Sequence, residues 1–388
     1  MYITICLSFT TKYKEKMIMG FPGYIVKEFP PTQENPRNSE GDFIKLKDGR
    51  IAFAYSRFSG GSEDGAKCDL AVSFSTDEGE TWSKERVFLT PSECNGFNLM
   101  SVSLLPLQDG TVGLFYLKKY KGMQCKAFLR KTVDFESFSD EICCFDEPGY
   151  YTVNNQRIIR QKNGNIVIVA GYTDTTQIEI TEAFSNHNYH GFPWPAGRVA
   201  VYVSSNDGVS WTRTAVLNPP FKEMCKGSDI GLQEPGVVEL DDGALYIYFR
   251  NNTGRQLQSF SYDGGYTWSA IEPSRFTAPP SPMNTLRLKN GNILIGYNPI
   301  PYFFGRQTVF NGNWTGARTP YVLEIADGNM QPLVGPRAIE SDERAGFCYC
   351  ALHELDDAIL LGYCAGGEND KGGCLTRLRI RKILKEDL

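Results

Sequence analysis

The chain has 388 residues, of which 41% are hydrophobic and 13% aromatic, and it contains 38 glycines and 21 prolines. This composition is typical of a globular protein that is rich in turns and β-forming residues. The 40 basic and 45 acidic residues are interspersed, with a net charge of −5 and no long run of one sign. Such a pattern argues against a nucleic acid or an anionic membrane surface as a partner.

The N-terminal segment 1–19 has only a short apolar run, with no basic residues before it and no small-residue cleavage site after it. Such a segment is a poor signal peptide, and its apolar part is too short to span a bilayer. We therefore predict an N-terminal extension at 1–19, a single domain at 20–388, no membrane insertion and a cytoplasmic location.

The eleven cysteines are odd in number and irregularly spaced, and no two of them form a Cys-x-x-Cys pair. This excludes the common zinc-ribbon and thioredoxin patterns. We predict reduced, mostly buried thiols in a reducing compartment and no metal site.

One pattern recurs along the chain, a polar Asp/Asn-Gly turn followed by a run of apolar residues. Such turns favour positive φ at their central positions and join two strands in a tight hairpin. The pattern occupies 46–55, 107–116, 161–170, 240–249, 288–297 and 355–364. In the last copy Ala358 replaces the glycine.

These six hairpins are separated by roughly 50 to 80 residues, without a convincing amphipathic helix between them. This spacing predicts an all-β fold, a β-propeller of six blades. The last blade lacks a fourth strand, which the segment 24–29 ("YIVKEF") would supply. Pairing of the N- and C-terminal strands would then close the ring and remove its exposed edges.

A second motif lies between successive hairpins, as "STDEGETW" at 75–82, "SSNDGVSW" at 204–211 and "SYDGGYTW" at 261–268. Its Asp or Asn side chain can accept backbone N–H groups within the turn, and its tryptophan can pack between strands. We therefore interpret the motif as structural rather than catalytic. It resembles the Asp-box of sialidases, and the chain is most similar to bacterial sialidase-like proteins with BNR repeats, a resemblance that covers nearly its whole length.

Strand direction places the hairpin turns and the boxes on one face of the ring. Residues one strand length away, about seven to twelve positions from each turn, should gather on the opposite face. The polar residues at these distances are Arg37, Arg57, Arg157, Glu234, Arg250, Arg318 and Tyr349.

The resemblance to sialidases assigns roles to several of these residues. It implies that Arg37, Arg250 and Arg318 bind a substrate carboxylate, that Tyr349 is the nucleophile and that Glu234 is its partner. The general acid/base would be Asp64, with Glu63 and Asp69 as alternatives in the same loop. Arg57 and Arg157 would be further substrate contacts.

The implied activity is that of an exo-acting, retaining glycoside hydrolase without a cofactor. Its substrate would be a sialylated glycan, or one that carries a related acidic keto-sugar. Two alternatives stay open, namely a non-catalytic glycan-binding propeller and an enzyme that acts on a different acidic sugar. Glu234 could instead only form a salt bridge, and Tyr349 could be a packed core residue.

Two departures from the family pattern bear on specificity. Asn38, Ser39 and Glu40 follow Arg37 where many sialidases have Ile-Pro, and Glu40 and Asp42 add negative charge. An insertion at 173–197 is expected to overhang the site, where Trp194 would stack on a sugar ring. His187 and His190 lie in this insertion, but with one other histidine in the chain they predict no metal site.

Overall fold

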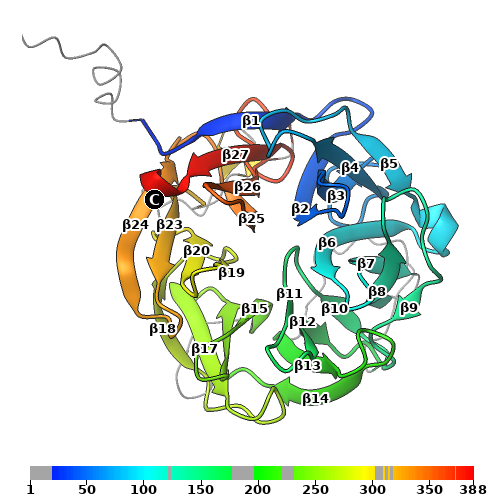
Figure 1. Ribbon diagram of the computed structural model, residues 1–388, viewed down its shortest axis with the longest axis vertical. Helices are drawn as coiled ribbons and strands as arrows, with labels where there is room; N and C mark the ends of the chain where they lie inside the picture. Colours follow the sequence, from blue (N-terminus) through cyan, green and yellow to red (C-terminus); the bar gives the residue numbers. More distant parts are fainter. Residues whose placement is uncertain are drawn as a thin grey trace, which may run out of the picture.

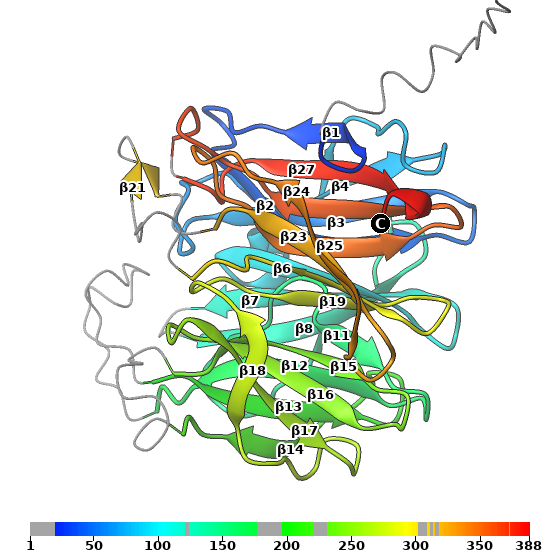
Figure 2. The same ribbon diagram turned by 90° about the vertical axis from the view of Figure 1, so that its left-hand side faces the viewer.

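The computed structural model describes residues 20–120, 124–176, 196–220, 231–301, 309–310, 313–314, 318–371 and 373–388. They form β-strands together with the short 3-10 helices η3 (Pro91–Cys94) and η5 (Lys385–Asp387), as an all-β fold predicts. Figure 1 shows the strands in sets around a common centre, and Figure 2 shows these sets from the side. Within these ranges no helix is long and apolar enough to cross a membrane.

Neighbouring strands pair antiparallel in consecutive sets along the chain. The first set is β2 (Arg37–Lys45), β3 (Ile51–Phe58), β4 (Cys68–Ser75) and β5 (Arg86–Leu89). The second is β6 (Asn98–Pro106), β7 (Val112–Tyr120), β8 (Gln124–Thr132) and β9 (Ile142–Cys143). The third is β11 (Ile158–Arg160), β12 (Ile166–Thr173), β13 (Arg198–Ser204) and β14 (Thr212–Leu217), and β10 (Tyr150–Thr152) also pairs with β12.

The later sets follow the same order. The fourth is β15 (Gln233–Glu239), β16 (Leu245–Arg250), β17 (Arg255–Ser261) and β18 (Glu272–Thr277). The fifth is β19 (Asn284–Arg287), β20 (Ile293–Tyr297), β23 (Tyr321–Ala326) and β24 (Pro332–Glu340), and the short strands β21 (Val309–Phe310) and β22 (Asn313–Trp314) pair with each other. The last is β25 (Cys348–Glu354), β26 (Ala358–Cys364), β27 (Leu378–Leu384) and β1 (Tyr24–Phe29).

The last set joins the two ends of the chain. β1 pairs antiparallel with β27, with Tyr24 opposite Lys382 and Phe29 opposite Leu378. The predicted pairing of the N- and C-terminal strands is therefore confirmed. Figure 1 shows β1 at the rim, outside β27, and the first strand of each set nearest the centre. These first strands, β2, β6, β11, β15, β19 and β25, are called the inner strands below.

Each predicted hairpin is present and joins the first two strands of a set. In the first of them, the Gly49 backbone N–H donates to the Leu46 carbonyl over 3.0 Å, and Gly49 has a φ of 90°. Glycine adopts this left-handed conformation without the steric cost that a Cβ would add. The last hairpin closes without glycine, through a 2.8 Å bond from the Leu355 N–H to the Ala358 carbonyl.

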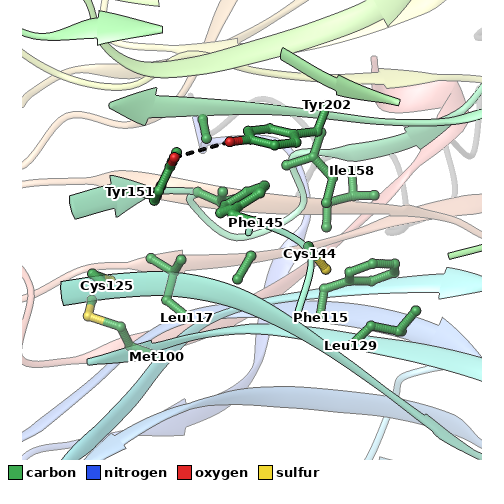
Figure 3. Packing of buried hydrophobic residues seen from close by; sticks show 14 of the residues in the cluster. Met100, Phe115, Leu117, Cys125, Leu129, Cys144, Phe145, Tyr151, Ile158 and Tyr202 are labelled. Atoms are coloured by element: carbon green, nitrogen blue, oxygen red, sulfur yellow. Dashed lines mark hydrogen bonds between the residues drawn. The ribbon is translucent and has the colours of Figure 1, made fainter. Parts of the chain in front are cut away.

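Apolar side chains fill the space between neighbouring sets. Figure 3 shows the cluster between the second and third sets, where Phe115, Phe145 and Tyr202 are buried. The hydroxyls of Tyr151 and Tyr202 lie 3.1 Å apart, so these buried polar groups are satisfied within the cluster. All the cysteines in the described part of the chain are free thiols, and most are buried, as predicted.

One side chain links several inner strands to one another. The Gln156 amide donates to Asp42 over 2.9 Å and to the Leu352 carbonyl over 2.6 Å. Its oxygen accepts bonds from the Leu352 N–H and from Asn284. Asp42 is fully buried, and desolvation raises its pKa to about 7 against the lowering by its three donors. Gln156 therefore stabilises contacts between sets that are distant in sequence.

The tryptophan-containing boxes form closed turns. Asp263 accepts the Thr267 N–H over 2.9 Å, while Trp268 donates to the Gly265 carbonyl over 3.2 Å and packs against a core cluster. The boxes lie beside the hairpins, since the Gln108 N–H donates to Asp207 over 2.9 Å. These bonds are those that the structural interpretation predicts, and the bond between Gln108 and Asp207 places one box beside one hairpin, as the shared face requires.

Replacing Asp263 with alanine should lower the free energy of unfolding by about 1 kcal/mol, because the turn loses several hydrogen bonds to one exposed carboxylate. Ligand binding and turnover should be unchanged, because the box lies on the opposite face from the candidate site. Urea denaturation and a turnover assay measure the two effects. Tyr262→Ala, at a side chain of the same turn that is 75% exposed, is the control. A loss of turnover at unchanged stability would contradict the structural role.

Candidate functional site

The inner strands share a backbone irregularity that positions the site. β2, β6, β15 and β25 each contain a bulge, at which two residues oppose one on the next strand. The first bulge residue has a positive φ, of 55° at Glu40, 59° at Ser101, 41° at Glu234 and 53° at Tyr349. Gln156, between β10 and β11, has a φ of 55°. Non-glycine residues in this conformation cost roughly 1–3 kcal/mol each and cluster at functional sites.

The bulges of β15 and β25 bring a tyrosine and a glutamate together. The Tyr349 hydroxyl donates to Glu234 Oε1 over 2.6 Å. The other carboxylate oxygen of Glu234 is 2.6 Å from Arg250 Nη1, and that nitrogen is 3.4 Å from the Tyr349 oxygen. A phenol, a carboxylate and a guanidinium therefore meet in one contact.

The protonation states of this pair follow from their surroundings. Burial raises the pKa of Tyr349 well above its usual value, and the charge of Glu234 raises it further. Burial would also raise the pKa of Glu234, but Arg250 and the hydrogen bond from Tyr349 lower it overall. Glu234 is therefore an ionised carboxylate beside a protonated phenol. Its carboxylate is therefore placed to accept the proton of this phenol.

Arg37 begins β2 and is held in a fixed orientation. Its guanidinium stacks on Phe58 with 4.2 Å to the ring centroid, and its Nε donates to Ser39 Oγ over 2.9 Å. Nη2 lies 3.4 Å from Glu40, whose other oxygen accepts a hydrogen bond from Ser101. Two bulge residues thus support the buried side of Arg37.

Asp64 contacts Arg37 from the solvent side. Its carboxylate lies 2.5 Å from Arg37 Nη1, although its side chain is 65% exposed. Desolvation at the site would raise its pKa, but the charges of Arg37 and Lys119 lower it to about 2. In this arrangement Asp64 is ionised at neutral pH and has no proton to give.

Arg318 is buried beside the tyrosine. Its guanidinium lies 5.4 Å from the centroid of the Tyr349 ring. Nη1 is 3.2 Å from the Cys348 sulfur and 3.8 Å from the Cys374 sulfur, and Nη2 donates to the Pro280 carbonyl over 3.3 Å. Sulfur and carbonyl acceptors thus fix Arg318 beside the Tyr349 ring.

The other two arginine candidates, Arg57 and Arg157, do not join this group. Arg157 is buried and donates to the Tyr248 hydroxyl over 2.7 Å, which uses its guanidinium in packing between the third and fourth sets. Arg57 adjoins Phe58 in β3, so its side chain leaves the opposite face of the strand from the one on which Arg37 stacks. Within the described residues no hydrogen bond or ion pair joins either arginine to Tyr349.

The three candidates for the general acid/base lie in different surroundings. Asp69 is buried and accepts a 3.1 Å hydrogen bond from Ser59, while Glu63 is exposed in the loop after β3. Of the three, Asp64 is the one in contact with Arg37. Trp194, His187 and His190 lie outside the described residues. In the described part of the chain no group of three or more His, Cys, Asp or Glu side chains could hold a metal ion.

Comparison with known protein families shows which family the sequence matches. The family model of the BNR repeat-like domain matches residues 58–360. The chain belongs to the BNR repeat-like family. This BNR repeat-like protein is 27% identical over 250 residues to a sialidase of Paraclostridium sordellii, an alignment that covers 59% of the chain and 56% of the relative. The alignment thus spans little more than half the length of that curated relative.

Solved structures share the fold of this BNR repeat-like protein. The NanB sialidase of Streptococcus pneumoniae superposes with a TM-score of 0.64 at 12% identity, covering 98% of this chain and 73% of that one. A leech intramolecular trans-sialidase, solved with 2,7-anhydro-Neu5Ac, gives 0.65 at 14% identity, covering 94% and 70%. A protein of unknown function from Dyadobacter fermentans gives 0.66 at 17% identity, covering 93% and 99%. The predicted sialidase-like BNR-repeat family is therefore confirmed.

The sequence-based prediction of the site in this BNR repeat-like protein missed several of its residues. Glu40 was noted only as added charge, yet it lies beside Arg37 and bonds to Ser101. The thiols of Cys348 and Cys374 contact Arg318 from positions 26 residues apart. The sequence did offer a signal for Glu40, because an acidic residue three positions after Arg37 can form an ion pair with it. No local signal marks Ser101 or the thiols, because the bulges and the long-range packing place them.

Proposed function

We propose that the protein is an exo-acting glycoside hydrolase that removes a terminal sialic acid, or a related acidic keto-sugar, from a glycan with retention of configuration. The observation that carries the proposal is the 2.6 Å hydrogen bond from the Tyr349 hydroxyl to Glu234, held beside Arg250. The sialidases among its relatives support this substrate class.

We also propose that residues 20–388 are one six-bladed β-propeller, with each antiparallel set as a blade. The pairing of β1 with β27 supports closure of the ring, and the six antiparallel sets of the described residues support the blade count. The inner strands of the blades then surround the candidate site.

The proposed mechanism begins with recognition of a carboxylate. Guanidinium groups bind carboxylates through charge-assisted hydrogen bonds. Arg250 and Arg318 lie beside Tyr349, and the proposal adds Arg37 as the third carboxylate-binding arginine. A keto-acid sugar carries its carboxylate on the anomeric carbon, so binding this group places that carbon near the tyrosine hydroxyl. A carboxylate nucleophile would be repelled there, whereas a neutral phenol is not.

The covalent step then proceeds by two displacements. The Tyr349 oxygen bonds to the anomeric carbon while its proton passes to Glu234. The leaving glycan oxygen takes a proton from Asp64, which must leave Arg37 and be protonated before this step. Water next attacks the same carbon and gives a proton to Asp64, while the tyrosine oxygen leaves and recovers its proton from Glu234. Two inversions give net retention, in the tyrosine variant of glycoside hydrolysis.

The wild-type protein tests this proposal directly. It should release phenol from an aryl α-sialoside, and NMR of the earliest product should show the α-anomer of the free sugar. A β-anomer formed first would overturn retention, and a 2,7-anhydro or unsaturated product would replace hydrolysis with another reaction. Ligand-dependent thermal stabilisation without turnover of sialosides or keto-deoxy sugars would favour the glycan-binding alternative.

A further inference from the structure

The contacts of Arg37 fall into a permanent group and an exchangeable one. Its Nε and Nη2 face Ser39 and Glu40, both buried within β2, and Glu40 has a side-chain exposure of only 4%. Its Nη1 faces the loop after β3, where it meets the Ser62 carbonyl at 3.1 Å and the Asp64 carboxylate at 2.5 Å. Of these carboxyl groups only Asp64 can leave Arg37 by rotating into solvent.

The backbone of this loop is fixed independently of the Asp64 side chain. The Asp64 carbonyl accepts hydrogen bonds from Lys119 and from Asn98, and Asn98 also donates to the Ala66 carbonyl over 2.6 Å. Rotation of the Asp64 side chain therefore requires no movement of the loop. The carboxylate can leave Arg37 while the Asp64 backbone stays in place.

The proposed reaction places two conflicting demands on Asp64. A ligand carboxylate needs the outward-facing donor of Arg37, which Asp64 occupies. The leaving-group oxygen needs a proton, which Asp64 lacks while it is paired with Arg37. One exchange satisfies both demands.

We propose that Asp64 occupies, on Arg37, the position that the ligand carboxylate takes, and that ligand binding displaces Asp64 into its role as the acid. The inference rests on the proposed function. It makes Asp64 a specificity determinant, because a sugar without an anionic group cannot replace it on Arg37. The exchange replaces one carboxylate with another at Arg37 Nη1 and leaves the ion pair with Glu40 in place.

The displaced carboxylate then acquires its proton from solvent. The charged groups that act on it are Arg37 from β2, Lys119 from β7, Arg318 before β23 and Glu40 from the β2 bulge. When Arg37 is occupied by the ligand, the strongest of the favourable charges is neutralised, while Glu40 continues to oppose ionisation. Protonation of Asp64 is thus coupled to carboxylate recognition.

The experiment measures binding of 2,3-didehydro-2-deoxy sialic acid, a non-hydrolysable carboxylate, to wild type and to Asp64→Ala by calorimetry. The variant should bind about tenfold more tightly, because the ligand no longer competes with an internal carboxylate for a charge-assisted contact. Turnover of the aryl sialoside should nevertheless fall, because the acid is missing. The methyl ester of the same ligand should show no gain in affinity.

Glu63→Ala is the matched control, since it removes a negative charge one residue away that has no described contact with Arg37. It should leave affinity for the acid within about twofold of wild type. Equal gains in both variants would reduce the effect to general electrostatics and overturn the proposal, as would unchanged or weaker binding by Asp64→Ala. Failure of the proposed function is a separate result, namely no sialoside turnover by wild type.

Discussion

Replacing Tyr349 with phenylalanine is expected to lower kcat on an aryl sialoside about a thousandfold or more. The substitution removes the oxygen that would bond to the anomeric carbon and the proton that Glu234 would accept. It keeps the aromatic ring beside Arg318, so affinity for a non-hydrolysable carboxylate ligand should change little. Steady-state kinetics and calorimetry measure the two quantities.

Tyr363→Phe is the matched control for this experiment. Tyr363 is buried in β26, and its hydroxyl donates to Glu340 over 2.5 Å, so both variants lose a buried hydrogen bond from a phenol to a carboxylate. The two should lose similar stability, while only Tyr349→Phe should lose turnover. Retention of turnover in Tyr349→Phe, or an equal loss in both, would rule out the tyrosine as nucleophile.

Replacing Gln156 with alanine is expected to lower the free energy of unfolding by about 3 kcal/mol. The amide makes four hydrogen bonds, to Asp42, to Asn284 and to both backbone groups of Leu352. Truncation leaves buried donors and acceptors of three other sets without their partner. Urea denaturation should show a lower midpoint at an unchanged slope.

Gln331→Ala tests whether any glutamine at a turn would have this effect. Gln331 is exposed, and its side chain makes one 3.5 Å contact with the Asn329 carbonyl. Its loss should change stability by no more than about 0.5 kcal/mol. A similarly small effect for Gln156→Ala would mean that water replaces the amide between the inner strands.

Much of the architecture could be predicted because its determinants are local. Asp-Gly and Asn-Gly turns adopt positive φ by their own preference, so a few residues are enough to predict each hairpin. The boxes can be predicted for the same reason, since Asp263 forms hydrogen bonds within its own turn. Even the pairing of β1 with β27 followed from counting strands between such turns.

The fine geometry of the site is not encoded locally. Glu40, Ser101 and Tyr349 adopt positive φ without any intrinsic preference for it, because the regular pairing before and after each bulge with the next strand imposes it. The contact of Asp64 with Arg37 joins a loop to a strand 27 residues earlier in the chain. The spacing of residues in the sequence therefore predicted on which face the site lies. It did not predict which charged side chains form ion pairs there.

The recurring bulge allows the side chain at the candidate site to vary without a change in the fold. Each bulge holds one side chain at a comparable place on a different inner strand, and these side chains are an acid, an alcohol, a second acid and a phenol. The backbone around each is fixed by pairing with the next strand of its set, whatever the side chain. The side chain at a bulge can therefore change by a single substitution while the strands remain as they are.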